Sequence, residues 1–211
     1  MRVLLADDHP VFSEGLRTLI EVQPDMQVVG IASTGRDAVA LASSLQPDIV
    51  IMDHSMPEMN GTEAARAIRA RLPEVKIVIL SMHSNAIHAY RALQAGAAAY
   101  VVKWEDAAQV VEAVRIVQAG KRYVSESLMS DLLHQLMTDA PADPLATLSA
   151  RERQVLQMLA EGNSVARTAE ALSLSPKTVE TYRSRLMGKL GLDNMVALVH
   201  FAARHGLVSF E

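Results

Sequence analysis

The chain has 211 residues, of which 50% are hydrophobic and 4% aromatic, and its formal net charge is −4. These values are typical of a soluble globular protein with two domains of ordinary size. The chain contains no cysteine, which excludes a disulfide framework and a thiolate metal site and is compatible with a cytoplasmic location. No apolar stretch approaches the roughly 18 residues that a membrane-spanning helix needs, so we expect no contact with a membrane.

Residues 1–120 alternate short apolar runs with segments of helical spacing. The runs lie at residues 3–6, 27–32, 48–52, 76–80 and 98–102. Two of them read IVIM and IVIL, apolar at consecutive positions, which is typical of parallel strands buried on both faces. The first strand, over residues 2–7, runs into two aspartates where a signal peptide needs a longer apolar core. We therefore predict a doubly wound, five-stranded parallel α/β sheet with helices on both faces, a flavodoxin-like fold.

Several helix starts are marked in this part of the chain. Pro10 follows His9 and suits the first position of a helix. Thr34 and Ser84 each precede a helical segment, and either could supply an N-cap oxygen. Pro57 and Gly61 follow the third strand, where we expect them to shape a loop.

The character of the sequence changes after Gly120. A linking helix is predicted over residues 125–137, followed by TDAPADP, whose two prolines cannot continue a helix. From Leu148 onward every segment has helical spacing, beginning with a capping box between Ser149 and Glu152. We therefore expect domains at 1–120 and 147–211, joined by a linker at 121–146.

The two expected domains differ in the sign of their charge. Residues 1–120 contain 10 basic and 14 acidic residues, whereas residues 147–211 contain 8 basic and 6 acidic residues. A weakly basic, all-helical second domain attached to an acidic first domain is compatible with binding to nucleic acid.

The polar residues of the first domain fall at the carboxyl ends of its predicted strands, where an open parallel sheet places its ligand site. We expect five of them to converge: Asp7, Asp8, Asp53, Ser81 and Lys103. Three carboxylates held close together repel one another unless a hard divalent cation neutralises them, and Mg²⁺ is the natural candidate.

These residue types fit phosphoryl transfer. A carboxylate can attack phosphorus to form an acyl phosphate, while a metal and an ammonium group neutralise the phosphoryl oxygens. We predict Asp53 as the nucleophile, Lys103 as the partner of the phosphoryl group and Ser81 as a hydroxyl donor to it. The predicted Mg²⁺ ligands are Asp7, Asp8, Asp53 and the backbone carbonyl of Ser55.

The segments DDHP, MDHSMPEMNG, LSMH and AYVVK resemble the receiver domain of bacterial two-component response regulators, over residues 1–120. The resemblance implies phosphotransfer from a histidine kinase to Asp53. It also implies a switch in which Ser81 and the ring of Tyr100 rearrange towards the phosphate. His54 and His83 occupy positions beside the site that vary in this family, and we assign them no required role.

The third helix of the second domain suits DNA binding. Ser175 can cap this helix and Pro176 takes its first position, while Val179, Leu186 and Leu190 face the core at helical spacing. Its polar surface has four basic residues against one acidic, with hydroxyls between them, and can contact base edges and phosphates in a major groove. The candidate DNA-binding residues are Lys177, Thr178, Glu180, Thr181, Tyr182, Arg183, Ser184, Arg185 and Lys189.

The opening LSARE, the TVET turn and the KLGL ending resemble the C-terminal domain of the LuxR-type, or NarL/FixJ, regulators. By position, the resemblance implies that Glu180, Thr181 and Ser184 lie nearest the bases. The residues that it places nearer the phosphates are Lys177, Tyr182, Arg183, Arg185 and Lys189. The chain departs from the common pattern of the family at Tyr182, where histidine is frequent, and at Met195, where arginine is frequent.

Together these features predict a phosphorylation-controlled, DNA-binding transcription regulator rather than an enzyme. The resemblance suggests two routes of control, between which the sequence does not choose. In one, the unphosphorylated receiver masks the recognition helix. In the other, phosphorylation favours a homodimer that aligns two helices with half-sites about 10 base pairs apart. Part of the final helix, over residues 194–204, could serve as a dimer interface.

Two rival interpretations fit the sequence less well. A small Mg²⁺-dependent hydrolase also uses an aspartate nucleophile, but this chain has adjacent Asp7 and Asp8 instead of a spaced D-x-D, and no insertion long enough for a substrate cap. The receiver fold could alternatively be an interaction module that is never phosphorylated, which the presence of Asp53 and Lys103 disfavours. Neither G-x-G-x-x-G nor G-x-x-x-x-G-K-[ST] occurs, so a nucleotide-binding domain is not predicted.

Overall fold

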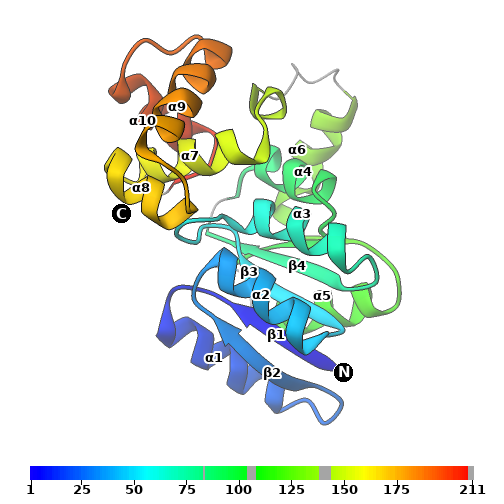
Figure 1. Cartoon of the computed structure of the whole chain (residues 1–211). Coiled ribbons are helices and arrows are strands. Elements are labelled where there is room, and N and C mark those ends of the chain that lie inside the picture. The colour runs from blue at the N-terminus through cyan, green and yellow to red at the C-terminus, as the bar shows by residue number, and fades with distance from the viewer. Residues whose placement is uncertain (83, 104–107, 138–143, 209–211) are drawn as a thin grey trace. The chain divides into compact units, whose positions relative to one another are not determined.

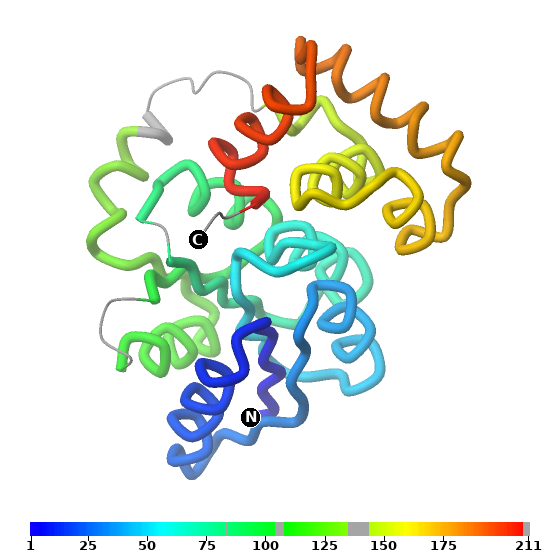
Figure 2. The backbone as a smooth tube through the Cα atoms, turned by 90° about the vertical axis from the view of Figure 1, so that its left-hand side faces the viewer, coloured from blue at the N-terminus to red at the C-terminus, as the bar shows by residue number. Residues whose placement is uncertain are grey.

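The computed structural model of the protein describes residues 1–82, 84–103, 108–137 and 144–208. The chain divides into two compact units, Met1–Asp139 and Ala140–Glu211, whose backbones can be followed in Figures 1 and 2. His83 and nearly all of the predicted TDAPADP break lie outside the described residues.

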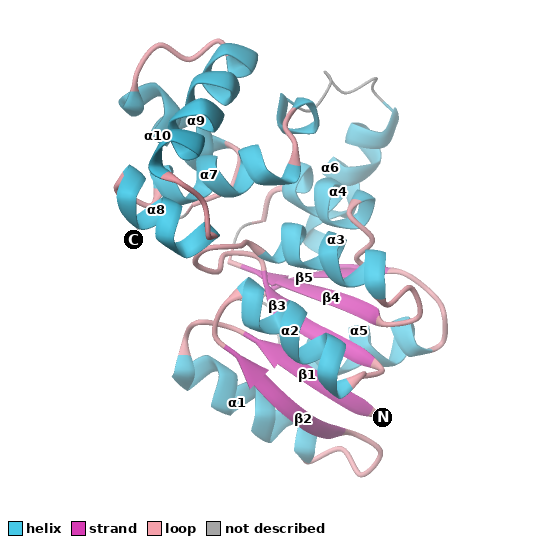
Figure 3. Cartoon of the chain, in the orientation of Figure 1, coloured by secondary structure: helices cyan, strands magenta, loops and turns pink. Residues whose placement is uncertain are grey.

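The first unit is a parallel sheet between two layers of helices (Figure 3), with the strand order β2-β1-β3-β4-β5-β6. Its strands are β1 (Arg2–Ala6), β2 (Gln27–Ala32), β3 (Ile49–Asp53), β4 (Lys76–Ser81), β5 (Ala99–Val102) and β6 (Tyr123–Val124). Its helices are α1 (Pro10–Glu21), α2 (Gly35–Leu45), α3 (Gly61–Arg71), α4 (Ala86–Gln94), α5 (Ala108–Gln118) and α6 (Glu126–Met137).

The sheet separates two hydrophobic cores. Because consecutive residues of a strand point to opposite faces, the apolar runs of the sequence fill both sides of the sheet. On one face, Leu4 and Val50 belong to a core completed by α2, α3, α4 and α6. On the other face, Val3 and Ile49 belong to a core completed by α1 and α5. The predicted doubly wound fold is confirmed.

The sheet has a sixth strand that the sequence does not predict. β6 contains two residues, which pair in parallel with Ala99 and Tyr100 of β5. α6 follows it, packs against α4 and buries Leu128 and Leu132 in the core of that face. A two-residue strand is too short to show a hydrophobic period, so residues expected in a linker in fact extend the first unit.

The helix starts agree with the sequence in all but one place. Pro10 lies in the first turn of α1, and the side chain of Thr34 accepts a hydrogen bond from the backbone N–H of Asp37. The predicted cap at Ser84 is wrong. α4 begins at Ala86, so Asn85 is the N-cap, and its side-chain oxygen accepts a hydrogen bond of 2.9 Å from the N–H of Ile87.

The described part of the second unit consists of helices. They are the short 3₁₀ helix Pro144–Thr147, α7 (Ala150–Ala160), α8 (Val165–Leu172), α9 (Pro176–Leu190) and α10 (Met195–Arg204). α7, α8 and α9 pack on one another and α10 packs on α7, around a core that includes Leu156, Val179 and Leu198. Gly191 ends α9 in the left-handed conformation, with φ of 65°.

None of the described helices has the length and apolar content that crossing a membrane would require.

Gly61 allows α3 to begin against the end of β3. Its N–H donates a 2.9 Å hydrogen bond to the carbonyl of His54, which closes the loop that follows the strand. A Cβ atom at this position would lie 2.2 Å from the carbonyl oxygen of Asp53, a contact that backbone cannot relieve without moving. The glycine expected to shape the loop is thus required by close approach to the functional edge of the sheet.

We predict that Gly61→Ala lowers the free energy of unfolding by about 1–3 kcal/mol, as overpacking does. The matched control is Gly15→Ala, because Gly15 lies within α1 and an added Cβ meets no atom within 4 Å. That substitution should raise stability by about 0.5–1 kcal/mol through helix propensity. Urea unfolding followed by circular dichroism measures both, and equal effects of the two substitutions would contradict the steric explanation.

Candidate phosphoacceptor and DNA-binding sites

Two carboxylates and one ammonium group meet at the carboxyl edge of the sheet. Asp7 follows β1, Asp53 ends β3 and Lys103 follows β5, and their side chains are between 2% and 4% exposed. The Nζ atom of Lys103 lies 2.6 Å from Oδ2 of Asp7 and 2.9 Å from Oδ2 of Asp53. The structure therefore brings together three of the residues that the sequence placed at strand ends.

Asp8 and His9 extend this cluster on the β1–α1 loop. One ligand atom from each of Asp7, Asp8, His9 and Asp53 lies within 4.8 Å of the others, close enough to share a metal ion. Nδ1 of His9 is 3.1 Å from Oδ1 of Asp8, yet that oxygen is buried and accepts no hydrogen bond from the described residues. His9 is not among the ligands predicted from the sequence, although it directly follows Asp7 and Asp8 in the chain.

The electrostatics of the cluster follow from its burial and its charges. Burial raises the pKa of Asp53 from 3.8 to about 6, and Asp7 adds to this increase, although Lys103 and the backbone N–H of Ser55 act against it. For His9, partial burial lowers the pKa, but the carboxylates of Asp8 and Asp7 raise it above its usual 6.5. The shift of Asp53 thus reflects mainly its burial, whereas the shift of His9 reflects the negative charge of Asp8 and Asp7.

Ser81 and Tyr100 lie beside the cluster on β4 and β5, and both are fully buried. Burial raises the pKa of the Tyr100 hydroxyl, while a hydrogen bond with the side chain of Ser81 acts in the opposite direction. The Tyr100 hydroxyl thus points to Ser81 in this structure.

The loop after β3 is connected to the Asp53 carboxylate. The N–H of Ser55 donates a 3.3 Å hydrogen bond to Oδ1 of Asp53.

His54 and His88 form a buried group next to Tyr100. The rings of the two histidines are 5.1 Å apart, and the His54 ring meets the Tyr100 ring edge-on at 6.3 Å. Nδ1 of His54 lies 3.4 Å from the hydroxyl of Thr62 on α3. His88 belongs to α4, so this group connects the strand that ends in Asp53 to a helix on the surface of the unit.

The candidate DNA-binding residues of α9 differ in exposure. Lys177, Glu180 and Thr181 are exposed, as are Ser184 and Arg185. Arg183 is half-buried, and its guanidinium lies 3.2 Å from Glu180, so part of its charge is offset within the helix. Thr178 and Tyr182 are half-buried too, and Tyr182 packs against the core of the unit.

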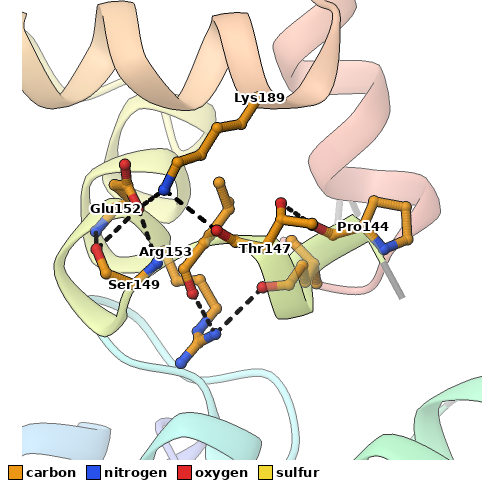
Figure 4. Close-up of polar contacts among 8 residues, drawn as sticks. Pro144, Thr147, Ser149, Glu152, Arg153 and Lys189 are labelled. Carbon is orange, nitrogen blue, oxygen red and sulfur yellow. Dashed lines mark hydrogen bonds and ion pairs between the residues drawn. The ribbon is translucent and has the colours of Figure 1, made fainter. Parts of the chain in front are cut away.

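Lys189 is engaged by groups of its own domain (Figure 4). Its Nζ atom lies 2.7 Å from Oε2 of Glu152 and donates a 3.1 Å hydrogen bond to the carbonyl of Thr147. The same Glu152 oxygen accepts hydrogen bonds from the N–H and the hydroxyl of Ser149, which completes the predicted capping box. The sequence predicts the capping box, but gives no sign that Lys189, some 37 residues later, joins it.

The carboxylate of Glu152 is held by several hydrogen bonds at once. Burial alone would raise its pKa, but the hydrogen bonds from Lys189 and Ser149 lower it to about 2. Arg153, one residue further along α7, donates to the carbonyl groups of Leu145 and Leu148 at 3.2 and 2.7 Å. The start of α7 is thus fixed to the preceding 3₁₀ segment as well as to α9.

Comparisons with known proteins agree with this division of the chain. Residues 3–115 match the response regulator receiver domain, and residues 146–202 match the luxR family of bacterial regulatory proteins. The chain is 40% identical over 212 residues to the response regulator UvrY of Escherichia coli K12, which covers 100% of this chain and 97% of that protein.

The fold of the chain is also similar to solved structures of response regulators. A LuxR-family two-component response regulator from Aurantimonas sp. SI85-9A1 is 37% identical with a TM-score of 0.62, covering 65% of this chain and 98% of that one. RcsB from Salmonella enterica serovar Typhimurium, bound to promoter P1flhDC with the phosphomimetic BeF₃⁻, is 29% identical with a TM-score of 0.59, covering 95% and 97%. The chain therefore belongs to the two-component response regulators, transcription regulators in which a receiver domain is joined to a LuxR-type DNA-binding domain.

Proposed function

We propose that Asp53 is the phosphoacceptor of this response regulator and that its phosphorylation controls the binding of α9 to DNA. The observation that carries the proposal is the buried Lys103 ammonium, 2.9 Å from Asp53 and 2.6 Å from Asp7. An ammonium in this place can transfer its interaction from a carboxylate oxygen to a phosphoryl oxygen with little movement.

The acidic cluster supports Mg²⁺ as the cofactor, with Asp7, Asp8, Asp53 and the backbone carbonyl of Ser55 as ligands. Three carboxylates face one lysine here, and the buried Oδ1 of Asp8 receives no hydrogen bond from the described residues. Oxygen donors of this kind and number suit a hard divalent cation. When bound, Mg²⁺ would supply positive charge to the phosphoryl oxygens and lower the pKa of Asp53.

The residues of the chain then have distinct tasks. A carboxylate oxygen of Asp53 forms a bond to phosphorus as the bond between phosphorus and the leaving group of the donor breaks. Lys103 pairs with a phosphoryl oxygen, and the Ser81 hydroxyl donates a hydrogen bond to another. Because Ser81 is hydrogen-bonded to Tyr100 in the present structure, that step frees the Tyr100 hydroxyl and allows its ring to move.

We further propose that the donor is a histidine kinase, that the target is double-stranded DNA, and that the phosphorylated protein acts in the cytoplasm as a homodimer. The exposed residues of α9 that support DNA contact include Lys177, Thr181, Ser184 and Arg185. We propose an anchoring task for Lys189, because Glu152 and the carbonyl of Thr147 already hold its ammonium. No turnover of a separate substrate is proposed.

The raised pKa of Asp53 makes stability depend on pH. Above pH 6 the carboxylate is charged in both the folded and the unfolded chain, and the folded protein bears the full cost of a buried charge beside Asp7. Below the usual carboxyl pKa of 3.8 it is protonated in both states, so this cost is absent. The contribution of Asp53 to the free energy of unfolding therefore increases as the pH falls from about 6 towards 3.8.

We predict that Asp53→Asn raises the free energy of unfolding of the Mg²⁺-free protein at pH 7.5 by about 1–3 kcal/mol. The gain should shrink as the pH falls below 6, because the wild-type carboxyl then takes up its proton. Urea unfolding in EDTA at pH 7.5 and pH 5 measures the difference. A gain of the same size at both pH values would show that burial of the charge is not its cause.

We predict that acetyl phosphate with Mg²⁺ tightens binding to an inverted-repeat DNA by roughly 5- to 150-fold in the wild type only. Fluorescence anisotropy with labelled duplex, comparing wild type and Asp53→Asn, measures this effect. Equal binding by both proteins under all conditions would support a phosphorylation-independent module. Continuous, rapid release of phosphate from acetyl phosphate without a change in DNA affinity would support the hydrolase.

The anchoring of Lys189 gives a separate prediction for the second unit. Glu152→Gln should lower its stability by about 1.5–3 kcal/mol, as loss of a charge-assisted hydrogen bond does. Because the pKa of Glu152 is about 2 in the folded protein and 4.5 for an unperturbed glutamate, this stabilisation is present above pH 4.5 and lost as pH falls towards 2.

Thermal unfolding at pH 7 and pH 3.5 checks the Glu152→Gln prediction, with exposed Glu170→Gln on α8 as the control. Lys189→Met should destabilise by a similar amount, and the double variant should cost less than the sum of the two. If Lys189→Met weakens DNA binding but leaves stability unchanged, the residue contacts phosphate and is not an anchor.

A further inference from the structure

The environment of Lys103 contains a third partner besides the two carboxylates. Its Nζ atom lies 4.3 Å from the centre of the Phe12 ring, over the face of the ring. The lysine side chain is 2% exposed, so this contact takes place where little water competes with it. The ammonium therefore contacts the ring as well as both carboxylates.

Phe12 is held in place by α1 rather than by the site itself. Pro10 fixes the start of this helix, and Leu16 and Ile20, further along it, are buried in the core that α1 forms with the sheet. Phe12 is half-buried and packs against the same core. The position of its ring is thus independent of the charge state of Asp7 and Asp53.

The face of an aromatic ring carries negative electrostatic potential and attracts a cation, most strongly where water is scarce. The Asp53 carboxylate would be a temporary partner of Lys103, because the proposed phosphoryl group would be attached through one of its two oxygens. The ring carries no formal charge and does not compete with a phosphoryl group for the ammonium. Its attraction persists before, during and after phosphorylation.

We propose that Phe12 is a positioning residue that holds the Lys103 ammonium at the phosphoryl-binding position by a cation–π contact, an inference that rests on the proposed role of Lys103. Without the ring, the four-carbon lysine stem gains rotamers that carry the ammonium away from Asp53. Some of these rotamers enter the space that Phe12 and Lys103 line together.

That space is a largely apolar cavity of about 840 Å³, whose walls include Leu19 of α1 and Val110 of α5. Because of this cavity, a smaller apolar side chain at position 12 would leave the Lys103 ammonium beside open space. The aromatic ring instead gives the ammonium a π face to contact. It also leaves room for a hydroxyl on the ring, so Phe12→Tyr keeps the contact without crowding.

The test separates binding of a phosphoryl analogue from binding of the metal. The full-length protein is titrated with beryllofluoride at saturating Mg²⁺ and, separately, with Mg²⁺ alone. The fluorescence of the single tryptophan, Trp104, which follows Lys103 in the sequence, reports both titrations. The variants are Phe12→Leu, Phe12→Tyr and, as a control on the same helical turn, Val11→Ala at a position that is 89% exposed.

Phe12→Leu should weaken beryllofluoride binding about 3- to 10-fold while changing Mg²⁺ affinity less than about twofold. Phe12→Tyr should restore beryllofluoride affinity to within about twofold of wild type, and Val11→Ala should match wild type. Unchanged beryllofluoride affinity in Phe12→Leu overturns the inference. So does a parallel loss of both affinities, which would mean a merely structural role, or a failure of Phe12→Tyr to restore binding.

A double-mutant cycle with Lys103→Met distinguishes this inference from the proposed function. If Lys103→Met itself binds beryllofluoride as wild type does, the proposed role of Lys103 fails and the role of Phe12 fails with it. If Lys103→Met weakens binding, Phe12→Leu should add no further loss in that background. An equal loss in both backgrounds would show that the ring acts without the ammonium. Should Phe12→Leu fold poorly by circular dichroism, Phe12→Met replaces it under the same criteria.

Discussion

Parallel pairing of β1 and β3 forces two carboxylates together at one edge of the sheet, and the ammonium of Lys103 must offset them. These strands are neighbours, and the lysine arrives from β5, 96 residues after Asp7 in the chain. Burial of Asp53 raises its pKa to about 6, and the neighbouring Asp7 carboxylate adds to this increase, because the one buried ammonium does not offset both effects. This edge is where we propose that a cation binds and that Asp53 is then modified.

Buried polar side chains lie between the acidic cluster and α4 on the surface of the receiver. Ser81 and Tyr100 are fully buried, and His54 and His88 are nearly so. In the proposed switch, a shift of the Ser81 hydroxyl would break its hydrogen bond with Tyr100, and in a close-packed interior the freed ring would move together with its neighbours. The His54 ring contacts both the Tyr100 ring and the ring of His88 on α4, so these rings would pass such a movement on to that helix. By this route the proposed phosphorylation of Asp53 would alter a helix on the surface.

Features that depend on residues close together in the chain could be predicted from the sequence. Apolar runs predicted the five longer strands, and oxygen-bearing residues before helices predicted caps at Thr34, Ser149 and Ser175. The convergence of Asp7, Asp53 and Lys103 followed from one topological rule, that strand ends of a parallel sheet share an edge. Features that depend on tertiary contact left no signal. Phe12 reads as an ordinary core position, and β6 is too short for any period to show.

The capping box at the start of α7 also takes part in a contact between residues far apart in the chain. Ser149 and Glu152 satisfy free N–H groups at the helix start, which the sequence alone predicts. The Glu152 carboxylate has acceptor capacity beyond these bonds, and Lys189 from the last turn of α9 takes it up. The angle between α7 and α9 is therefore set inside the second unit, by a charged pair and by the core around Leu186.

Because this pair and the core fix α9 within its own domain, the recognition helix does not need the receiver in order to form. The proposed phosphorylation of Asp53 therefore need not change the conformation of α9 itself. Control must act instead on whether the preformed helix is accessible or on whether two copies of it are aligned. Both routes suggested by the family resemblance meet this condition, and both leave the internal geometry of the DNA-binding domain unchanged. Under the proposed function, the element with two states would therefore lie in the receiver, at the site where the charge changes, and not in the DNA-binding domain.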